Sequence, residues 1–267
     1  MSDKLSSDSE SSTEEARERN LPRSKREGVA LCLSGGGSRA ALFELGALRR
    51  FNELGILGHV DTITSVSGGS ILAAHLATVM RPWPAAGEVF ADFDKRVAAP
   101  FERFVTRNLR TAPVAERVLL PWNWRRDDTA VTALARLFGR YLTPLRLVDV
   151  ERPPRFVFCA TDNNFAVNWV MTSRVVGSYQ AGYAPTPPEW SLARAVAASS
   201  CFPPVFQPMP VGIPPSAFRH GRYGMRGETD REEIMKGLSL SDGGLYDNLA
   251  LEPAWKDHAV VLAVDGG

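Results

Sequence analysis

The sequence lacks any long hydrophobic run. The first twenty residues, MSDKLSSDSESSTEEARERN, contain no apolar stretch that could form the core of a signal peptide. No window approaches the roughly 18 to 20 consecutive apolar residues that a membrane-spanning helix needs. We therefore expect a cytoplasmic protein whose contact with a membrane, if it makes one, is peripheral.

An excess of charge and a large number of cysteines are also missing. The 31 Lys and Arg residues nearly balance the 30 Asp and Glu residues, which leaves a net charge of +1 and no electrostatic basis for binding nucleic acid. The three cysteines, Cys32, Cys159 and Cys201, are odd in number, far apart and set in apolar or strand-like segments. They are expected to be buried thiols in a reducing compartment, and neither a disulfide framework nor a zinc site is expected.

The composition divides the chain into a polar tail and one domain. Residues 1–26 are rich in Ser, Glu, Arg and Lys and almost free of large apolar side chains, so we expect them to be disordered. Residues 27–267 are long enough for one large α/β domain. The last apolar segment, AVVLAVDGG at 259–267, predicts a buried strand with no closing helix after it, and the domain is therefore expected to be truncated at its C-terminal end.

Two strand, glycine turn and helix units follow the tail. The apolar run at 28–34 reaches Gly35, Gly36 and Gly37, after which apolar residues recur at helical spacing. The alternating segment at 59–67 likewise reaches a glycine pair and then an apolar helix. Successive units of this kind predict a three-layer α/β/α fold with a mainly parallel central sheet.

The remaining segments fit the same fold class. Residues 82–145 are expected to be mainly helical, with an apolar stripe from Val89 to Phe104 that Pro100 kinks. The stripe is interpreted as core more readily than as an acyl pocket or a membrane contact. Further strands are predicted near residues 155–162, 168–173 and 237–242, and a helix at 191–200.

Ser67 lies where the second predicted strand meets its helix, within the segment SVSGGS. This context matches a nucleophile elbow, G-x-S-x-G, in which small residues flank the serine because the turn is tight. Ser65 replaces the first glycine of that pattern and Gly69 holds the second. Serines are common in turns, so the motif alone fits an ordinary turn as well as a catalytic one.

A serine nucleophile needs a base, and the four histidines are not well placed to supply one. His59 and His258 fall at the amino ends of predicted strands, whereas reactive groups of open α/β sheets gather at the carboxyl ends. Asp242 directly follows a predicted strand, and Gly243 and Gly244 allow a sharp turn there. Taken alone, an Asp-Gly-Gly sequence is also an ordinary turn.

The glycine run Gly35-Gly36-Gly37 presents backbone N–H groups at the start of a helix, an arrangement that stabilises an oxyanion or binds a phosphate. Gly35, Gly37 and Ala40 also satisfy the dinucleotide fingerprint G-x-G-x-x-[GA]. A Rossmann-type oxidoreductase is therefore the alternative, although the second strand ends without the acidic residue that would hold a ribose.

Together these segments resemble the patatin-like phospholipase family over about residues 28–267. SGGGSRA is similar to the family's glycine-rich loop, SVSGGS to its serine elbow and SDGGLYDNLALEPA to its Asp-Gly-Gly segment, and ASSCFPPVF is also similar. The sequence departs from the common pattern with Ser34 in place of Asp, Ala40 in place of Gly and Ser65 in place of Gly.

The resemblance implies a lipid acyl hydrolase of the phospholipase A or lysophospholipase type. Ser67 would be the nucleophile and Asp242 its base, in a dyad without histidine, metal or cofactor. The backbone of Gly35 to Gly37 would form the oxyanion hole, and Arg39 would brace that loop. The substrate would be a lipid or another acyl ester; a catalytically inactive lipid-binding domain of the same fold is a second alternative.

Overall fold

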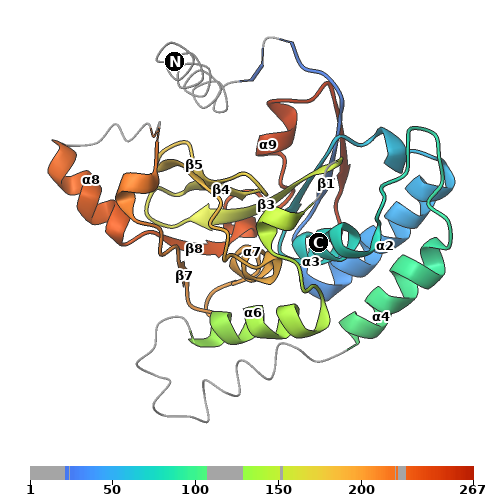
Figure 1. Ribbon diagram of the computed structural model, residues 1–267, viewed down its shortest axis with the longest axis horizontal. Coiled ribbons are helices and arrows are strands. Elements are labelled where there is room, and N and C mark those ends of the chain that lie inside the picture. Colours follow the sequence, from blue (N-terminus) through green and yellow to red (C-terminus); the bar gives the residue numbers. More distant parts are fainter. Residues whose placement is uncertain (1–21, 24, 107–128, 151–152, 220, 222–226) are drawn as a thin grey trace, which may run out of the picture.

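The computed structural model describes residues 22–23, 25–106, 129–150, 153–219, 221 and 227–267 (Figure 1). Most of the polar tail predicted at 1–26 lies outside these residues, as do His220 and the middle of the helical region predicted at 82–145.

The described residues form one sheet with the strand order β6-β5-β4-β3-β2-β1-β9, and β8 pairs with both β3 and β7. The strands are β1 Val29–Leu33, β2 Thr62–Val66, β3 Arg155–Asp162, β4 Val167–Met171, β5 Val175–Ser178, β6 Gly182–Pro185, β7 Met209–Pro210, β8 Ser239–Asp242 and β9 Val260–Val264. The strands β9, β1, β2 and β3 are parallel to their neighbours in that order, whereas β4, β5, β6 and β8 pair antiparallel.

Helices cover both faces of the sheet. They are α2 Gly37–Glu53, α3 Gly68–Val79, α4 Ala99–Val105, α6 Thr129–Tyr141, α7 Leu192–Ser199, α8 Gly227–Lys236 and α9 Glu252–Trp255, and a π-helical turn at Asp94–Ala98 leads into α4. In Figure 1, α2, α3 and α7 lie on one side of the central strands and the short α9 on the other.

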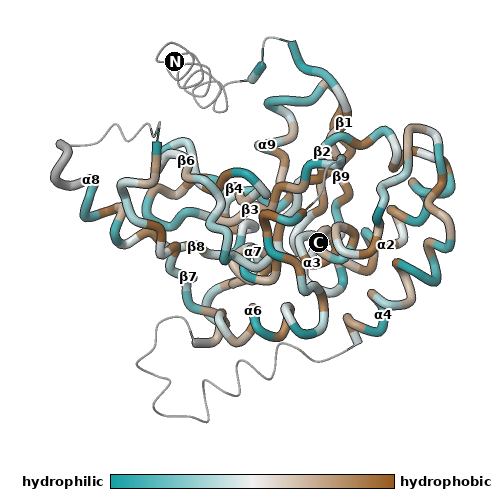
Figure 2. Tube along the Cα trace, in the orientation of Figure 1, coloured by the Kyte–Doolittle hydropathy of each residue, from teal (hydrophilic) through white to brown (hydrophobic). Residues whose placement is uncertain are grey.

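Strand β1 shows how the alternation of its side chains builds the layers. Leu31 and Leu33 belong to the main core with residues of α2 and α3, whereas Ala30 and Cys32 pack with Ala254 of α9 on the opposite face. Both faces of β1 are therefore buried, which is why its sequence is continuously apolar. Hydrophobic residues concentrate along these central strands and the adjoining helices (Figure 2). The three-layer α/β/α fold predicted from the sequence is confirmed.

Two sequence expectations are wrong in detail. β9 pairs only with β1 in the described chain and Val260 is 48% exposed, so the predicted buried strand lies at an edge. Val89 is exposed and leaves the apolar stripe, whereas Phe93, Val97 and Phe101 are buried in the core as the interpretation favoured.

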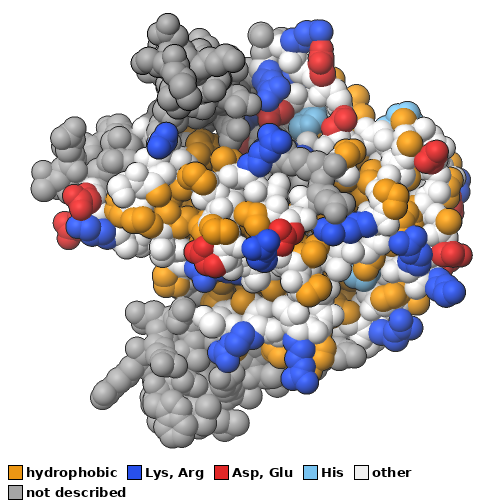
Figure 3. Space-filling model, in the orientation of Figure 1, with side chains coloured by type: hydrophobic (Ala, Val, Ile, Leu, Met, Phe, Trp, Pro, Cys, Tyr) orange, Lys and Arg blue, Asp and Glu red, His pale blue; other side chains and the backbone are white. Residues whose placement is uncertain are grey.

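No helix within the described ranges is long and apolar enough to cross a membrane. On the face shown in Figure 3, Lys and Arg side chains are scattered among acidic, polar and hydrophobic ones.

Candidate active site

Ser67 occupies a strained turn between β2 and α3. Its backbone has φ 49° and ψ −114°, a conformation that residues with a Cβ rarely adopt. Such strain costs on the order of 1–3 kcal/mol and persists only where the surroundings enforce it. The strand–turn–helix context predicted for a nucleophile elbow is therefore present, with Ser67 at its apex.

The two glycines after Ser67 let three backbone segments approach one another. A Cβ on Gly68 would collide with the carbonyl oxygen of Gly37, and one on Gly69 would collide with the carbonyl group of Leu33. The N–H of Gly69 also donates to the carbonyl oxygen of Ser34 at 2.9 Å. The start of α3 is thus packed directly against β1 and the glycine loop, which explains why the segment reads S-G-G.

Strand β8 brings Asp242 to the end of β2 by a route that the sequence did not predict. The sequence placed both residues at the carboxyl edge of parallel strands, but β8 runs antiparallel to β3. Strand β2 ends at Val66 opposite Cys159, and β8 ends at Asp242 opposite Ala160, the next residue of β3. Because β4 occupies the other edge of this part of β3, β2 and β8 share one edge and meet head to head. Their carboxyl ends therefore point toward each other.

The backbone around Asp242 is fixed by several hydrogen bonds. Its carboxylate oxygen Oδ1 accepts from the N–H of Gly244 at 2.8 Å, its N–H donates to Cys201 O at 3.2 Å, and its carbonyl oxygen accepts from Thr161 at 2.8 Å. The side chain is buried, with 3% of its surface exposed. Gly243 packs against Cys159 O and the side chain of Val66.

Ser67 and Asp242 line one cavity of about 660 Å³. It lies between the beginnings of α2 and α3, the end of α4, helix α6 and the segment after α7. Its polar wall also includes Gly36, Gly37, Gly244 and Asn248. Most of the remaining lining is hydrophobic: Ala41, Ile71, Phe104, Val105, Leu134, Phe138, Phe202, Val205 and Phe206. Phe104, from the predicted apolar stripe, is thus both a core and a cavity residue.

The glycine loop contributes unequally to the cavity. Gly36 and Gly37 line it, whereas Gly35 is buried beneath and its N–H donates to Asn248 O at 2.8 Å. The Gly35 N–H is therefore engaged within the protein, which limits the predicted oxyanion donors to those of Gly36 and Gly37. Arg39 is exposed and forms no hydrogen bond or ion pair with another described residue, so its bracing role stays a prediction.

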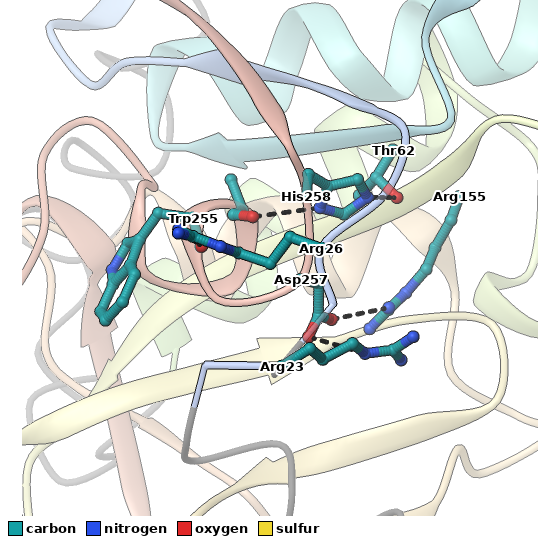
Figure 4. Close-up of polar contacts among 8 residues, drawn as sticks. Arg23, Arg26, Thr62, Arg155, Trp255, Asp257 and His258 are labelled. Atoms are coloured by element: carbon teal, nitrogen blue, oxygen red, sulfur yellow. Dashed lines mark hydrogen bonds and ion pairs between the residues drawn. The ribbon is translucent and has the colours of Figure 1, made fainter.

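The described histidines all lie away from the cavity. His59 is exposed, and His75 is buried with Nε2 2.9 Å from Val97 O; burial lowers its pKa. His258 sits at the amino end of β2, where Nδ1 is 3.0 Å from Ala254 O and Nε2 is 2.9 Å from the Thr62 hydroxyl (Figure 4). Both of its ring nitrogens are satisfied, so His258 is a structural histidine, as its strand position indicated.

Figure 4 also shows ion pairs and a hydrogen bond at this end of the sheet, opposite the cavity. Arg23 and Arg155 both pair with Asp257, at 3.3 and 3.8 Å, and Arg26 donates to the carbonyl oxygen of Trp255 at 3.2 Å. These contacts attach the residues before β1, and the start of β3, to the end of α9 and the residues that follow it.

The cysteines are free and buried, as the sequence predicted. Burial raises the pKa of Cys32 to about 11 and that of Cys201 to about 12, so both are protonated thiols at neutral pH. No cluster of His, Cys, Asp and Glu side chains in the described part of the chain is arranged to hold a metal ion.

Sequence reasoning missed two contributors to the site. Asn248 lines the cavity, accepts the Gly35 N–H and donates its side-chain amide to Gly267 O at 3.1 Å. Ser199, at the end of α7, accepts the N–H of Ser67. Both lie in segments that carry the family resemblance, SDGGLYDNLALEPA and ASSCFPPVF, which was the available signal.

The chain is similar to several solved structures. A human GIVD cytosolic phospholipase A2 in complex with methyl gamma-linolenyl fluorophosphonate and terbium chloride is similar in fold, with a TM-score of 0.51 and 16% identity over 93% of this chain and 43% of that one. Another structure of the human enzyme has a TM-score of 0.43 and 18% identity, over 70% of this chain and 31% of that one. VipD from Legionella pneumophila has a TM-score of 0.33 and 12% identity, over 85% of this chain and 47% of that one.

The chain spans less than half the length of each of these structures. No curated protein matches it. The family model for patatin-like phospholipases matches residues 31–255, which include the glycine loop, Ser67 and Asp242, and gives no support to a dinucleotide-binding protein. The chain therefore belongs to the patatin-like phospholipase family of lipid acyl hydrolases.

Proposed function

We propose that this chain hydrolyses fatty-acyl esters of lipids, with Ser67 as nucleophile and Asp242 as its base. The observation that carries the proposal is the head-to-head ending of β2 and β8 along β3, which brings both residues to one largely hydrophobic cavity. Neither motif is specific alone, but an elbow serine and a buried carboxylate sharing a cavity fit acyl transfer.

The reaction has two steps. In the first, the Asp242 carboxylate takes the hydroxyl proton of Ser67 as Oγ bonds to the ester carbonyl carbon. The carbonyl oxygen becomes an oxyanion next to the N–H groups of Gly36 and Gly37. Its collapse breaks the bond to the alcohol, which leaves with the proton from Asp242. In the second step, Asp242 accepts a proton from water as the water attacks the acyl-enzyme; the bond between the acyl carbon and Ser67 Oγ then breaks, Oγ takes the proton from Asp242, and the fatty acid is released.

The cavity supports an acyl chain as the group next to the scissile bond. Ile71 lies one helical turn after Ser67, and Phe104, Leu134 and Phe138 continue the hydrophobic lining away from it. Removing apolar surface from water contributes about 25 cal/mol per Å². A long acyl chain bound there is therefore stabilised before the reaction, whereas a polar acyl group is not.

The rim of the cavity supports peripheral contact with lipid. Phe202 and Val205 line the cavity and are 51% and 50% exposed. Large apolar side chains that remain exposed beside an apolar cavity fit a surface that touches aggregated lipid while a substrate enters.

Hydrolysis of a p-nitrophenyl acyl ester tests the dyad. Ser67→Ala and Asp242→Asn are each expected to abolish turnover, and a fluorophosphonate is expected to label Ser67 covalently. Asp265 offers a matched control because it heads the second Asp-Gly-Gly sequence of the chain but is exposed and outside the cavity lining. Asp265→Asn is expected to retain activity. Turnover by folded Ser67→Ala or Asp242→Asn would refute the dyad, and a folded wild-type protein that is neither labelled nor active would refute the hydrolysis itself.

A further inference from the structure

Three buried serine hydroxyls lie directly beneath the Ser67 turn. Ser65 belongs to β2, Ser70 to the first turn of α3 and Ser199 to the end of α7, and each side chain is fully buried. A buried hydroxyl is costly unless it is hydrogen-bonded. Three of them converging from separate elements therefore call for an explanation that the acyl-transfer chemistry alone does not give.

Their hydrogen bonds form one connected chain. Ser199 Oγ donates to Cys159 O at 2.6 Å and lies 2.8 Å from Ser70 Oγ. Ser70 Oγ lies 3.0 Å from Ser65 Oγ, and Ser65 Oγ donates to Val157 O at 3.4 Å. The chain thus links two carbonyl groups of β3 through three hydroxyls.

The number of hydroxyl hydrogens limits which of these contacts can be hydrogen bonds at the same time. Each hydroxyl has one hydrogen and two acceptor sites. Ser199 Oγ gives its hydrogen to Cys159 O and accepts the N–H of Ser67 at 3.0 Å, and the same N–H also lies 3.2 Å from the carbonyl oxygen of Ser199. Ser65 gives its hydrogen to Val157 O, so the single hydrogen of Ser70 chooses between Ser199 and Ser65. Whichever way the Ser70 hydrogen points, the Ser199 hydroxyl therefore joins a carbonyl oxygen of β3 to the N–H of the strained residue.

The end of α7 also holds the other proposed catalytic residue. The Ser200 hydroxyl donates to Ser67 O at 3.3 Å, and Cys201 O accepts the N–H of Asp242 at 3.2 Å. Residues 199–201 thus bond to the backbone of both Ser67 and Asp242. A shift of this segment changes the position of Ser67 Oγ relative to Asp242.

We propose that Ser199 is a positioning residue for acyl transfer: its hydroxyl, supported by Ser70, binds the N–H of Ser67 together with the carbonyl oxygen of Ser199 and so keeps the nucleophile in its strained conformation. This inference rests on the proposed function. It also assigns the Ser67 N–H to the protein interior, which leaves Gly36 and Gly37 as the oxyanion donors. Ser199 does not line the cavity, so it acts on the rate of acylation and not on substrate binding.

The test compares Ser199→Ala, Ser70→Ala and Ser65→Gly in the full chain. The readouts are the pre-steady-state burst of p-nitrophenolate and the rate of fluorophosphonate labelling, each normalised to folded protein. Ser199→Ala is expected to lower the acylation rate and kcat by roughly 10- to 100-fold with KM unchanged, because small misplacement of a reacting group costs up to about 100-fold. Ser70→Ala is expected to lower the acylation rate less than Ser199→Ala does. Ser65→Gly, which restores the usual elbow glycine, is expected to lower the acylation rate by no more than about twofold.

Thr186→Val is the matched control. Thr186 is buried beyond β6 and donates its hydroxyl to Thr172 O at 2.7 Å, so this change also removes a buried hydroxyl bond to a carbonyl group, far from the cavity. It is expected to react at the wild-type rate. If folded Ser199→Ala and folded Ser70→Ala both acylate at the wild-type rate, the positioning role of Ser199 is refuted and the proposed function is not. Absence of any reaction at Ser67 in the wild-type protein would instead refute the proposed function, and the role of Ser199 with it.

Discussion

The contact between the elbow and the glycine loop predicts opposite effects for the same substitution at two helical glycines. Gly68 is the first residue of α3, and Gly46 is an exposed residue in the middle of α2. A Cβ added at Gly68 would collide with Gly37 O and lie 2.9 Å from Gly37 N, whereas one added at Gly46 has nothing within 4 Å. Gly68→Ala and Gly46→Ala are thus matched in chemistry and differ only in their surroundings.

The magnitudes follow from these contacts. Because the colliding atoms belong to the backbone of Gly37, no side chain can rotate away, and optimal separations near about 3.5 Å require the loop to move by roughly 0.6–1.2 Å. Overpacking of this kind costs about 1–3 kcal/mol in the free energy of unfolding. Displacing an oxyanion donor costs about 10²–10³-fold in kcat. Gly46→Ala is instead expected to stabilise the fold by about 0.4–1 kcal/mol, since alanine loses less backbone entropy on folding.

The assay combines urea unfolding with steady-state hydrolysis of a p-nitrophenyl acyl ester, and activity is expressed per folded molecule. Gly68→Ala is expected to unfold at lower urea and to lose at least about 100-fold in kcat. Gly46→Ala is expected to unfold at higher urea with wild-type kinetics. If Gly68→Ala keeps kcat within threefold of wild type, then Gly37 is not the oxyanion donor that its packing against the elbow indicates.

Other changes test the core, the α7 helix and the cavity. Burial raises the pKa of the Glu44 carboxyl from its ordinary value of 4.5 to about 8, so the folded state holds a proton that the unfolded state has lost between these values. The free energy of unfolding is therefore expected to fall with rising pH across this window, by about 1.4 kcal/mol per pH unit, and Glu44→Gln to flatten that slope in urea titrations; an unchanged slope would contradict the assignment. Ser191→Ala removes the N-cap that accepts the Arg194 N–H at 3.0 Å and is expected to lower the unfolding free energy by about 1 kcal/mol, whereas an unchanged urea midpoint would show that the cap contributes little. Ile71→Phe narrows the cavity beside Ser67, so kcat/KM for a long-chain p-nitrophenyl ester is expected to fall more than that for the acetate; equal losses would place the acyl chain elsewhere.

Local signals explain why much of the architecture could be predicted. Strands β1, β2 and β3 consist mostly of apolar or β-branched residues; glycines begin two residues after β1 and β2, and β3 ends in an aspartate. Helix α7 begins at a serine cap and ends before two prolines. These features act within a few residues of the element they define. The short β5–β6 pair was missed, because its sequence carries glycines at 177 and 182, both with positive φ, and lacks a strand-like alternation.

The direction of β8 could not be read from its own residues. A strand of four residues has the same pattern whether it pairs parallel or antiparallel, so the partner decides. Here the antiparallel pairing with β3 brings the carboxyl end of β8, at Asp242, next to the carboxyl end of β2. The sequence argument assumed that both strands run parallel and end at the same edge of the sheet; in the structure the ends of β2 and β8 are neighbours because the two strands run in opposite directions along β3.

The departure at Ser65 shows how a degraded motif can still describe an intact turn. A buried hydroxyl without a partner costs about 1–3 kcal/mol, so Ser65 is acceptable in place of glycine only because Ser70 and Val157 O lie within hydrogen-bond reach. Ser70 is itself satisfied by Ser199, which lies 129 residues away in the sequence. No pattern of six residues around Ser67 contains that information. The requirement at this position of the elbow is therefore a small side chain whose polar atom is hydrogen-bonded, and glycine meets it simply by having no side chain.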